Sequence, residues 1–87
     1  MKTQTVTITN ETGLHARPAS LFVEEALKYK SEIFVDNGTQ KMSAKSILNI
    51  LCMAISKGQE ITISADGEDE EQAIASLVAI IKSDLDE

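Results

Sequence analysis

The sequence predicts an α+β fold, an open-faced β-sandwich in which a four-stranded antiparallel sheet carries three helices on one face. Four short segments alternate apolar and polar residues, the period of a strand with one buried face. Three longer segments place apolar residues at helical spacing. The order of the segments, βαββαβα, and a strong hairpin signal between the second and third strands favour an antiparallel sheet with all helices on its apolar side.

A strand and then a helix are expected at the start of the chain. Residues 5–9, TVTIT, alternate two apolar residues with threonines, and both residue types favour strands. Apolar residues then recur at helical spacing from Ala16 to about Tyr29. This helix must begin close to residue 16, because Pro18 is tolerated only in a first helical turn. The residues expected to face the core are Ala19, Phe22, Val23, Ala26 and Leu27.

A hairpin and a fourth strand complete the expected sheet. Asn37-Gly38 is the strongest hairpin signal in the chain because both residues tolerate positive φ. It implies paired strands near residues 32–36 and 39–43. Residues 60–66, EITISAD, alternate again and supply the last strand.

Two more helices are expected in the second half. Ser46 stands in the N-cap position before the apolar run ILNILCMAI, and Gly58 is expected to stop that helix. Asp69 and Gln72, three residues apart, resemble a capping box at the start of the final helix. The residues that the final helix is expected to bury are Ile74, Leu77, Val78, Ile81 and Leu85.

The composition fits a single domain, 1–87, with a small aliphatic core, because the 87 residues include two phenylalanines, one tyrosine and no tryptophan. The net charge of −6 argues against nucleic acid or an anionic membrane as the main partner. Residues 1–58 carry seven basic and five acidic side chains, and residues 59–87 carry one basic and nine acidic. The first part is therefore slightly positive and suited to acidic partners or phosphate.

Membrane and cysteine chemistry are also constrained. No apolar run approaches the roughly 20 residues that cross a bilayer, and no hydrophobic signal segment follows Lys2, so we expect a cytoplasmic protein. Cys52 is the only cysteine, which excludes an internal disulfide and a CxxC site. Its place in an apolar run predicts a buried, unreactive thiol.

His15, the only histidine, lies in the segment GLHARPAS at residues 13–20. The expected helix start makes it the cap, close to backbone N–H groups without intrahelical partners, at the positive end of the helix dipole. This setting keeps a ring nitrogen unprotonated and welcomes an anion, so His15 could accept a phosphoryl group held by those amides and by Arg17. The simpler interpretation is a polar cap, and spacing alone favours it. A metal site lacks further ligands, and a hydrolytic triad lacks a nucleophile elbow.

Ser46 and the helix after it form a second candidate site. A capping serine is the ordinary interpretation of Ser46, and a phosphate added there would turn the local surface strongly negative. The helix has more apolar side chains than one face of a small sheet can bury, so an apolar patch beside Ser46 is expected, of a kind that usually docks partners. A helix buried more deeply is the alternative. The candidates for the patch are Ile47, Leu48, Leu51 and Cys52.

Three segments closely resemble the HPr family, the histidine-containing phosphocarriers of the bacterial phosphoenolpyruvate:sugar phosphotransferase system. They are GLHARPAS at 13–20, SAKSIL at 43–48 and ITISADGEDEEQAI at 61–74. The resemblance implies an open-faced βαββαβα sandwich whose His15 takes a phosphoryl group on Nδ1 from enzyme I and hands it to the IIA domains of sugar permeases. It also implies that Arg17 holds the phosphate, assisted by the backbone amides of Ala16 and Arg17.

The resemblance further implies a regulatory site. Ser46 matches the serine that an ATP-dependent HPr kinase/phosphorylase modifies in many Gram-positive bacteria, where the phosphoserine form is co-effector of a catabolite control repressor. The residues that match the partner-contact surface are Ser20, Ile47, Leu48 and Leu51. Asn49 stands where many Gram-positive relatives have glycine, and Leu48 where methionine is frequent, so the docking contacts are expected to differ in detail.

Two functions of different classes are therefore predicted. The first is a phosphocarrier, a monomer that needs no metal or cofactor and is not itself an enzyme. The alternative is a regulatory HPr-like module that acts through Ser46 and its apolar helix as a transcriptional co-effector. A regulatory-only branch of the family lacks the active histidine, and this chain keeps His15, which favours phosphotransfer. A ligand-binding module without phosphate chemistry is a third possibility, but no glycine-rich loop or ligand cluster recommends it.

Overall fold

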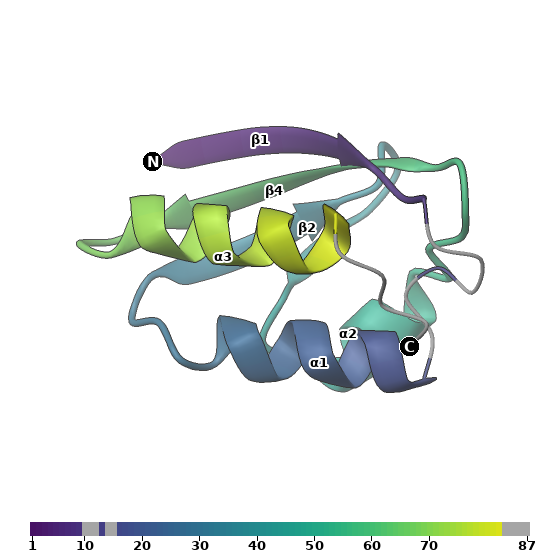
Figure 1. The fold of residues 1–87 in the computed structure, drawn as a ribbon, viewed down its shortest axis with the longest axis horizontal. Coiled ribbons are helices and arrows are strands. Elements are labelled where there is room, and N and C mark those ends of the chain that lie inside the picture. Colours follow the sequence, from purple (N-terminus) through teal and green to yellow (C-terminus); the bar gives the residue numbers. More distant parts are fainter. Residues whose placement is uncertain (10–12, 14–15, 83–87) are drawn as a thin grey trace.

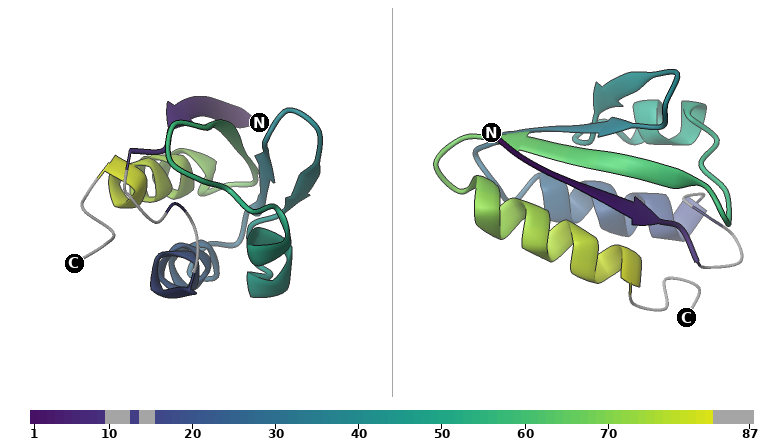
Figure 2. Two further views of the ribbon diagram at one scale, coloured as in Figure 1. Left: turned by 90° about the vertical axis from the view of Figure 1, so that its right-hand side faces the viewer. Right: turned by 90° about the horizontal axis from the view of Figure 1, so that it is seen from above.

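The computed structural model describes residues 1–9, 13 and 16–82. Its elements are β1 (Lys2–Thr7), α1 (Ala16–Ala26), β2 (Glu32–Asp36), β3 (Lys41–Ser43), α2 (Ile47–Cys52), β4 (Glu60–Asp66) and α3 (Glu70–Lys82). The strands form one antiparallel sheet in the order β1-β4-β2-β3. The helices lie on one side of this sheet (Figure 1; Figure 2, left). The predicted fold class is confirmed.

One face of the sheet is apolar and closes the core. Successive strand residues point to opposite faces, so in β4 Ile61, Ile63 and Ala65 are buried. Thr62 lies on the other face, where its hydroxyl is 2.9 Å from that of Thr5 in β1. The buried apolar side chains, aliphatic or sulfur-containing except for Phe22, are Val6, Ile8, Ala19, Phe22, Val23, Ala26, Ile33, Val35, Ala44, Ile50, Met53, Ile55, Ile61, Ile63, Ala65, Ala73, Ile74, Leu77, Val78 and Ile81.

The helix α1 begins where the sequence predicts and ends earlier. Pro18 lies in its first turn. After Ala26 the backbone tightens, and the Tyr29 amide donates to the Ala26 carbonyl oxygen at 3.3 Å, a three-residue span that ends the α-helix. Leu27 was expected in the core but is 58% exposed. The core residues confirmed in this helix are Ala19, Phe22, Val23 and Ala26.

The hairpin has a longer loop than Asn37-Gly38 predicts. Residue Asp36 pairs with Lys41, so residues 37–40 form a four-residue loop and β3 starts two residues late. Of Asn37 and Gly38, only Gly38 has positive φ, at 100°. The Asn37 side-chain oxygen accepts hydrogen bonds from the backbone amides two and three residues later, at 3.0 and 2.8 Å. The asparagine therefore closes the loop through its side chain.

The helix α2 ends at Cys52, and the prediction that it runs to Gly58 was wrong. Ala54 adopts a left-handed conformation with φ 52°, and its amide donates to Leu51 O at 3.2 Å. At 100° per residue, a continuing helix would turn Ile55 about 140° away from the core-facing Ile50. The left-handed turn instead lets Ile55 be fully buried.

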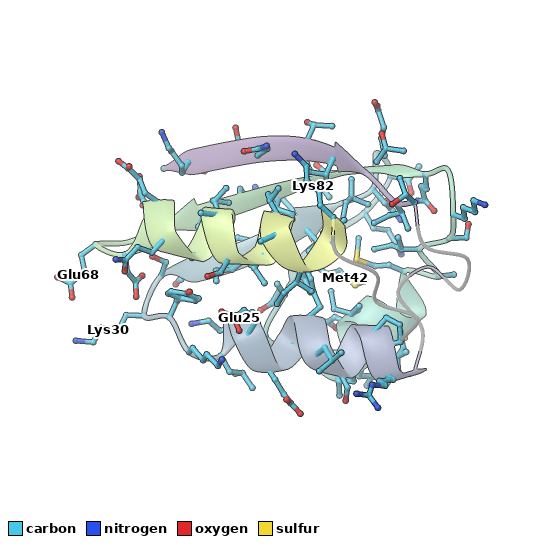
Figure 3. The ribbon with its side chains drawn as sticks, in the orientation of Figure 1. Glu25, Lys30, Met42, Glu68 and Lys82 are labelled. Carbon is cyan, nitrogen blue, oxygen red and sulfur yellow. The ribbon has the colours of Figure 1, made fainter. Side chains whose placement is uncertain are left out.

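The start of α3 is held differently from the predicted capping box of Asp69 and Gln72. The Asp69 carboxylate accepts hydrogen bonds from the Lys30 amide at 2.8 Å, the Ser31 amide at 3.0 Å and the Ser31 hydroxyl. Asp69 thus ties α3 to the loop between α1 and β2, at the opposite end of the molecule from the start of α1, beside the labelled Lys30 and Glu68 (Figure 3).

A different acidic residue, Glu70, accepts a hydrogen bond from a backbone amide three residues earlier, as the second member of a capping box does. The donor is the Gly67 amide, at 3.1 Å. The residues of α3 confirmed in the core are Ile74, Leu77, Val78 and Ile81. Leu85 lies outside the described residues.

Replacing Asp69 by Asn is expected to make stability less dependent on acid pH. The Ser31 hydroxyl, followed by the Lys30 amide, holds the pKa of the Asp69 carboxyl below its ordinary value. A depressed folded-state pKa gives stability that is present above the unfolded pKa of about 3.9 and is lost as pH falls through the folded pKa. Urea denaturation should show Asp69→Asn less stable than the parent at pH 7, with a smaller gap at pH 3. An equal gap at both values would contradict the tether.

Replacing Ala54 by Gly is expected to stabilise the fold by about 1 kcal/mol, because an L-residue with a side chain pays roughly that much in the left-handed region. Ala75→Gly is the matched control, since Ala75 is exposed within α3, and the change should cost about 1 kcal/mol there. Denaturation midpoints of the two variants should move in opposite directions.

Candidate functional site

The first turn of α1 presents two of the predicted site residues to solvent. Ala16 is the first helical residue. Arg17 and Ser20 are both exposed, and residues three apart share a helix face. His15 lies outside the described residues, so its position at the cap stays a prediction.

The electrostatics of this helix end suit an anion. The first turn of α1 contains no acidic side chain, and Arg17 contributes a permanent positive charge there. The amide groups that open a helix have no intrahelical acceptors, and the aligned peptide dipoles add partial positive charge. A phosphoryl group beside this turn would meet both backbone donors and a guanidinium.

The N-cap role of Ser46 is confirmed. Ser46 has an extended backbone, with φ −117° and ψ 116°, and its side chain accepts a hydrogen bond from the Asn49 amide at 3.3 Å. Its side chain is half-buried. The preceding residue, Lys45, donates its ammonium to the Tyr29 carbonyl oxygen at 2.7 Å, which links the start of α2 to the end of the turn after α1.

The predicted apolar patch on α2 is also confirmed. Leu48 is 67% exposed, and Ile47 and Leu51 are each 40% exposed. Ile50 is fully buried, so it faces the sheet. Cys52 is exposed, and the prediction of a buried thiol was wrong. It lies about 200° around the helix from Ile50. We call Ile47, Leu48, Leu51 and Cys52 the α2 patch.

The two helices that carry these residues lie side by side. In Figure 1 and in the end-on view of Figure 2 (left), α2 lies next to the N-terminal part of α1. The structure therefore brings Arg17 and Ser20 to the same end of the molecule as the α2 patch. This arrangement can hold a phosphoryl group beside an exposed apolar surface.

Two features of this region were not predicted. Gly13 is buried and packs against the backbone of residues 55–56, and the sequence offered only a glycine at a turn as a signal. The contact of Lys45 with Tyr29 has no local signal, because the two residues are far apart in sequence.

Within residues 1–9, 13 and 16–82, no helix is long and apolar enough to cross a membrane.

Comparison with known proteins places the chain in a family. The model of the family described as PTS HPr component phosphorylation site matches residues 2–83. Phosphocarrier protein HPr from Haemophilus influenzae is 48% identical over 81 residues, which cover 93% of this chain and 95% of that protein. HPr-like protein Crh from Bacillus subtilis is 41% identical over 85 residues, which cover 98% and 100%. The chain belongs to the HPr family of phosphocarrier proteins of the phosphotransferase system.

Solved structures agree with this assignment. The crystal structure of HPr-C-His from Thermoanaerobacter tengcongensis superposes with a TM-score of 0.96 at 48% identity and covers 100% of this chain and 98% of that chain. The crystal structure of an HPr dimer from the same organism gives a TM-score of 0.80 at 48% identity, with 100% of both chains covered.

Proposed function

We propose that this protein accepts a phosphoryl group on His15 from phospho-enzyme I and passes it to the IIA domains of sugar permeases. The observation that carries the proposal is the exposure of Arg17 in the first turn of α1, which contains no acidic side chain. Arg17 lies two residues after His15 in the sequence. Family membership and the intact segment GLHARPAS support it. The relative from Haemophilus influenzae, 48% identical to this chain, is a phosphocarrier by name.

The chemistry is a reversible exchange of one bond for another. The lone pair of His15 Nδ1 attacks phosphorus, a P–N bond forms, and the bond from phosphorus to the donor atom of enzyme I breaks, its electron pair staying on enzyme I. Arg17 and the amides of Ala16 and Arg17 offset the phosphoryl charge. Transfer to a IIA domain repeats the exchange with this protein as donor. Each molecule carries one group, so we propose a stoichiometric carrier and not an enzyme, with no metal or cofactor in the step.

Docking is proposed to use the α2 patch together with Ser20 and Arg17. An apolar centre flanked by a cation suits partners with an apolar contact surface and an acidic rim. We further propose that the chain acts as one domain, 1–87, in the cytoplasm and as a monomer. The dimeric HPr of Thermoanaerobacter tengcongensis makes sedimentation at several concentrations the direct check of the last point.

Labelling with phosphoenolpyruvate and enzyme I tests the carrier function. The parent protein should gain an acid-labile, base-stable phosphate, and His15→Ala should gain none. Arg17→Ala should be labelled about 100-fold more slowly, because one charged donor to the transferred group is lost. Lys41→Ala is the matched control, because it also removes one cation. Lys41 belongs to β3, and its Nζ lies 5.3 Å from the centroid of the Phe34 ring. It should be labelled at the parent rate. Equal labelling of His15→Ala would exclude the relay.

A second function, regulation through Ser46, is favoured by one observation. Ser46 caps α2 directly beside the exposed residues of the α2 patch. A phosphate there would add a charge of about −2 at neutral pH to the docking surface. We propose that this weakens binding of enzyme I and creates a surface for a catabolite control repressor, which fits the likeness to the HPr-like protein Crh.

Ser46→Asp and Ser46→Asn form a matched pair for this test. Both residues are good N-caps, so the two variants should have similar stability. Only Asp adds charge, and it should weaken enzyme I binding, measured by calorimetry, by about 10-fold at low salt. Equal affinity of the two variants for enzyme I would contradict the regulatory role. Equal affinity of the repressor for the phosphorylated and unphosphorylated protein would also contradict it.

A further inference from the structure

The connection between α2 and β4, residues 53–59, contacts the chain at Ile8 and again at Gly13, before α1 begins at Ala16. On the incoming side, Ile8 donates its amide to Gln59 O at 2.9 Å and accepts from the Gly58 amide at 2.8 Å. Ile8 is fully buried. The incoming end is therefore fixed by two backbone hydrogen bonds and by burial.

On the outgoing side, Gly13 is in close contact with the same connection. Gly13 is buried and has φ +65°. A Cβ added there would lie 2.3 Å from Ile55 O and 2.7 Å from the Cα of Ser56, below the 3.0 Å that real Cβ atoms respect. The obstructing atoms are backbone atoms, so no side-chain rotation can make room.

The connection itself has little freedom to yield. Ile55 is fully buried in the core. The Ser56 amide donates to Gln59 Oε1 at 3.2 Å, and the Gln59 amide donates to Ser56 O at 3.1 Å. A side chain at residue 13 would therefore have to move the chain around residue 13.

We propose that the contact of Gly13 with the Ile55–Ser56 backbone is a positioning device for phosphoryl transfer, which fixes how the chain enters α1 and so orients the His15 ring two residues later. This inference rests on the proposed carrier function. Moving the added Cβ from 2.3 Å to an ordinary van der Waals distance from Ile55 O needs a shift of about 1 Å. Misplacement of a reacting group by that much can cost about 100-fold in rate. In this proposal Gly13 is a positioning residue and not a catalytic one.

Two other glycines supply matched controls. Gly38 and Gly58 also have positive φ, at 100° and 89°, but a Cβ at either position would meet no atom within 4 Å. Alanine at these positions brings backbone strain without a clash. Any effect common to the three alanine variants reports strain, and an effect confined to Gly13→Ala reports the contact.

The experiment compares the parent protein with Gly13→Ala, Gly38→Ala and Gly58→Ala. Enzyme I turnover with each protein as acceptor, the half-life of the phosphohistidine and the NMR titration of His15 are measured, with urea denaturation alongside. We expect all three variants to lose stability. Only Gly13→Ala should lower turnover at saturating protein, by about 10- to 100-fold, with KM nearly unchanged because Arg17 and the α2 patch are intact. Its phosphohistidine half-life and its His15 titration should also differ from those of the controls.

Gly13→Ala that matches Gly38→Ala in turnover, half-life and titration would overturn the proposal. If Gly13→Ala does not fold, Gln59→Ala takes its place, because it removes the hydrogen bond to the Ser56 amide without adding a clash. Gln40→Ala in the hairpin loop is its control. Turnover and titration of Gln59→Ala equal to those of the control would then overturn the proposal. Failure of the carrier function is distinct, since the parent protein itself would not be labelled by enzyme I.

Discussion

Burial of the apolar face of the sheet under α1, α2 and α3 fixes where the ends of these helices lie. Phe22 of α1, Ile50 of α2 and Leu77 of α3 are all fully buried, so each helix is held by its inward face in the shared core. Burial of such side chains contributes roughly 1.5–3 kcal/mol each. The start of α1 and the α2 patch occupy the same end of the molecule because α2 packs beside the N-terminal part of α1.

The short helix α2 serves the core and the surface at once. Ile50 is buried on its inner side, and Leu48 and Leu51 are exposed on its outer side. Exposed leucines add nothing to the core, and the docking proposed above would account for them. The Lys45 ammonium and the Ser46 cap hold the start of this helix, so the patch is presented on a fixed support.

Periodicity in the sequence identifies the elements, and contacts between distant segments decide where they end. Alternation in residues 60–66 and the helical spacing after Ala16 are local patterns, and both elements are confirmed. The end of α2 depends on returning Ile55 to the core, which no local pattern reveals. The local pattern predicts that Asp69 caps its own helix. It does not reveal the hydrogen bond with Ser31, because Ser31 is 38 residues away in sequence.

The candidate site was predictable to a similar degree. Ile47, Leu48 and Leu51 are exposed as expected, since an excess of apolar side chains in a short helix is a local signal. The role of His15 stays a prediction, because it depends on residues outside the described part. The contact of Gly13 with residues 55–56 could not be predicted, because the sequence does not distinguish a glycine that is buried against a distant segment from one in an exposed turn.

The exposure of Cys52 has a practical consequence for work on this protein. It is the only cysteine in the chain, so a maleimide or iodoacetamide reagent will modify one known position, inside the α2 patch. A dye attached there would obstruct the surface under study and is better moved to the open side of the sheet. The same thiol offers a footprint, because the rate at which it is alkylated reports how much of the patch a bound protein covers.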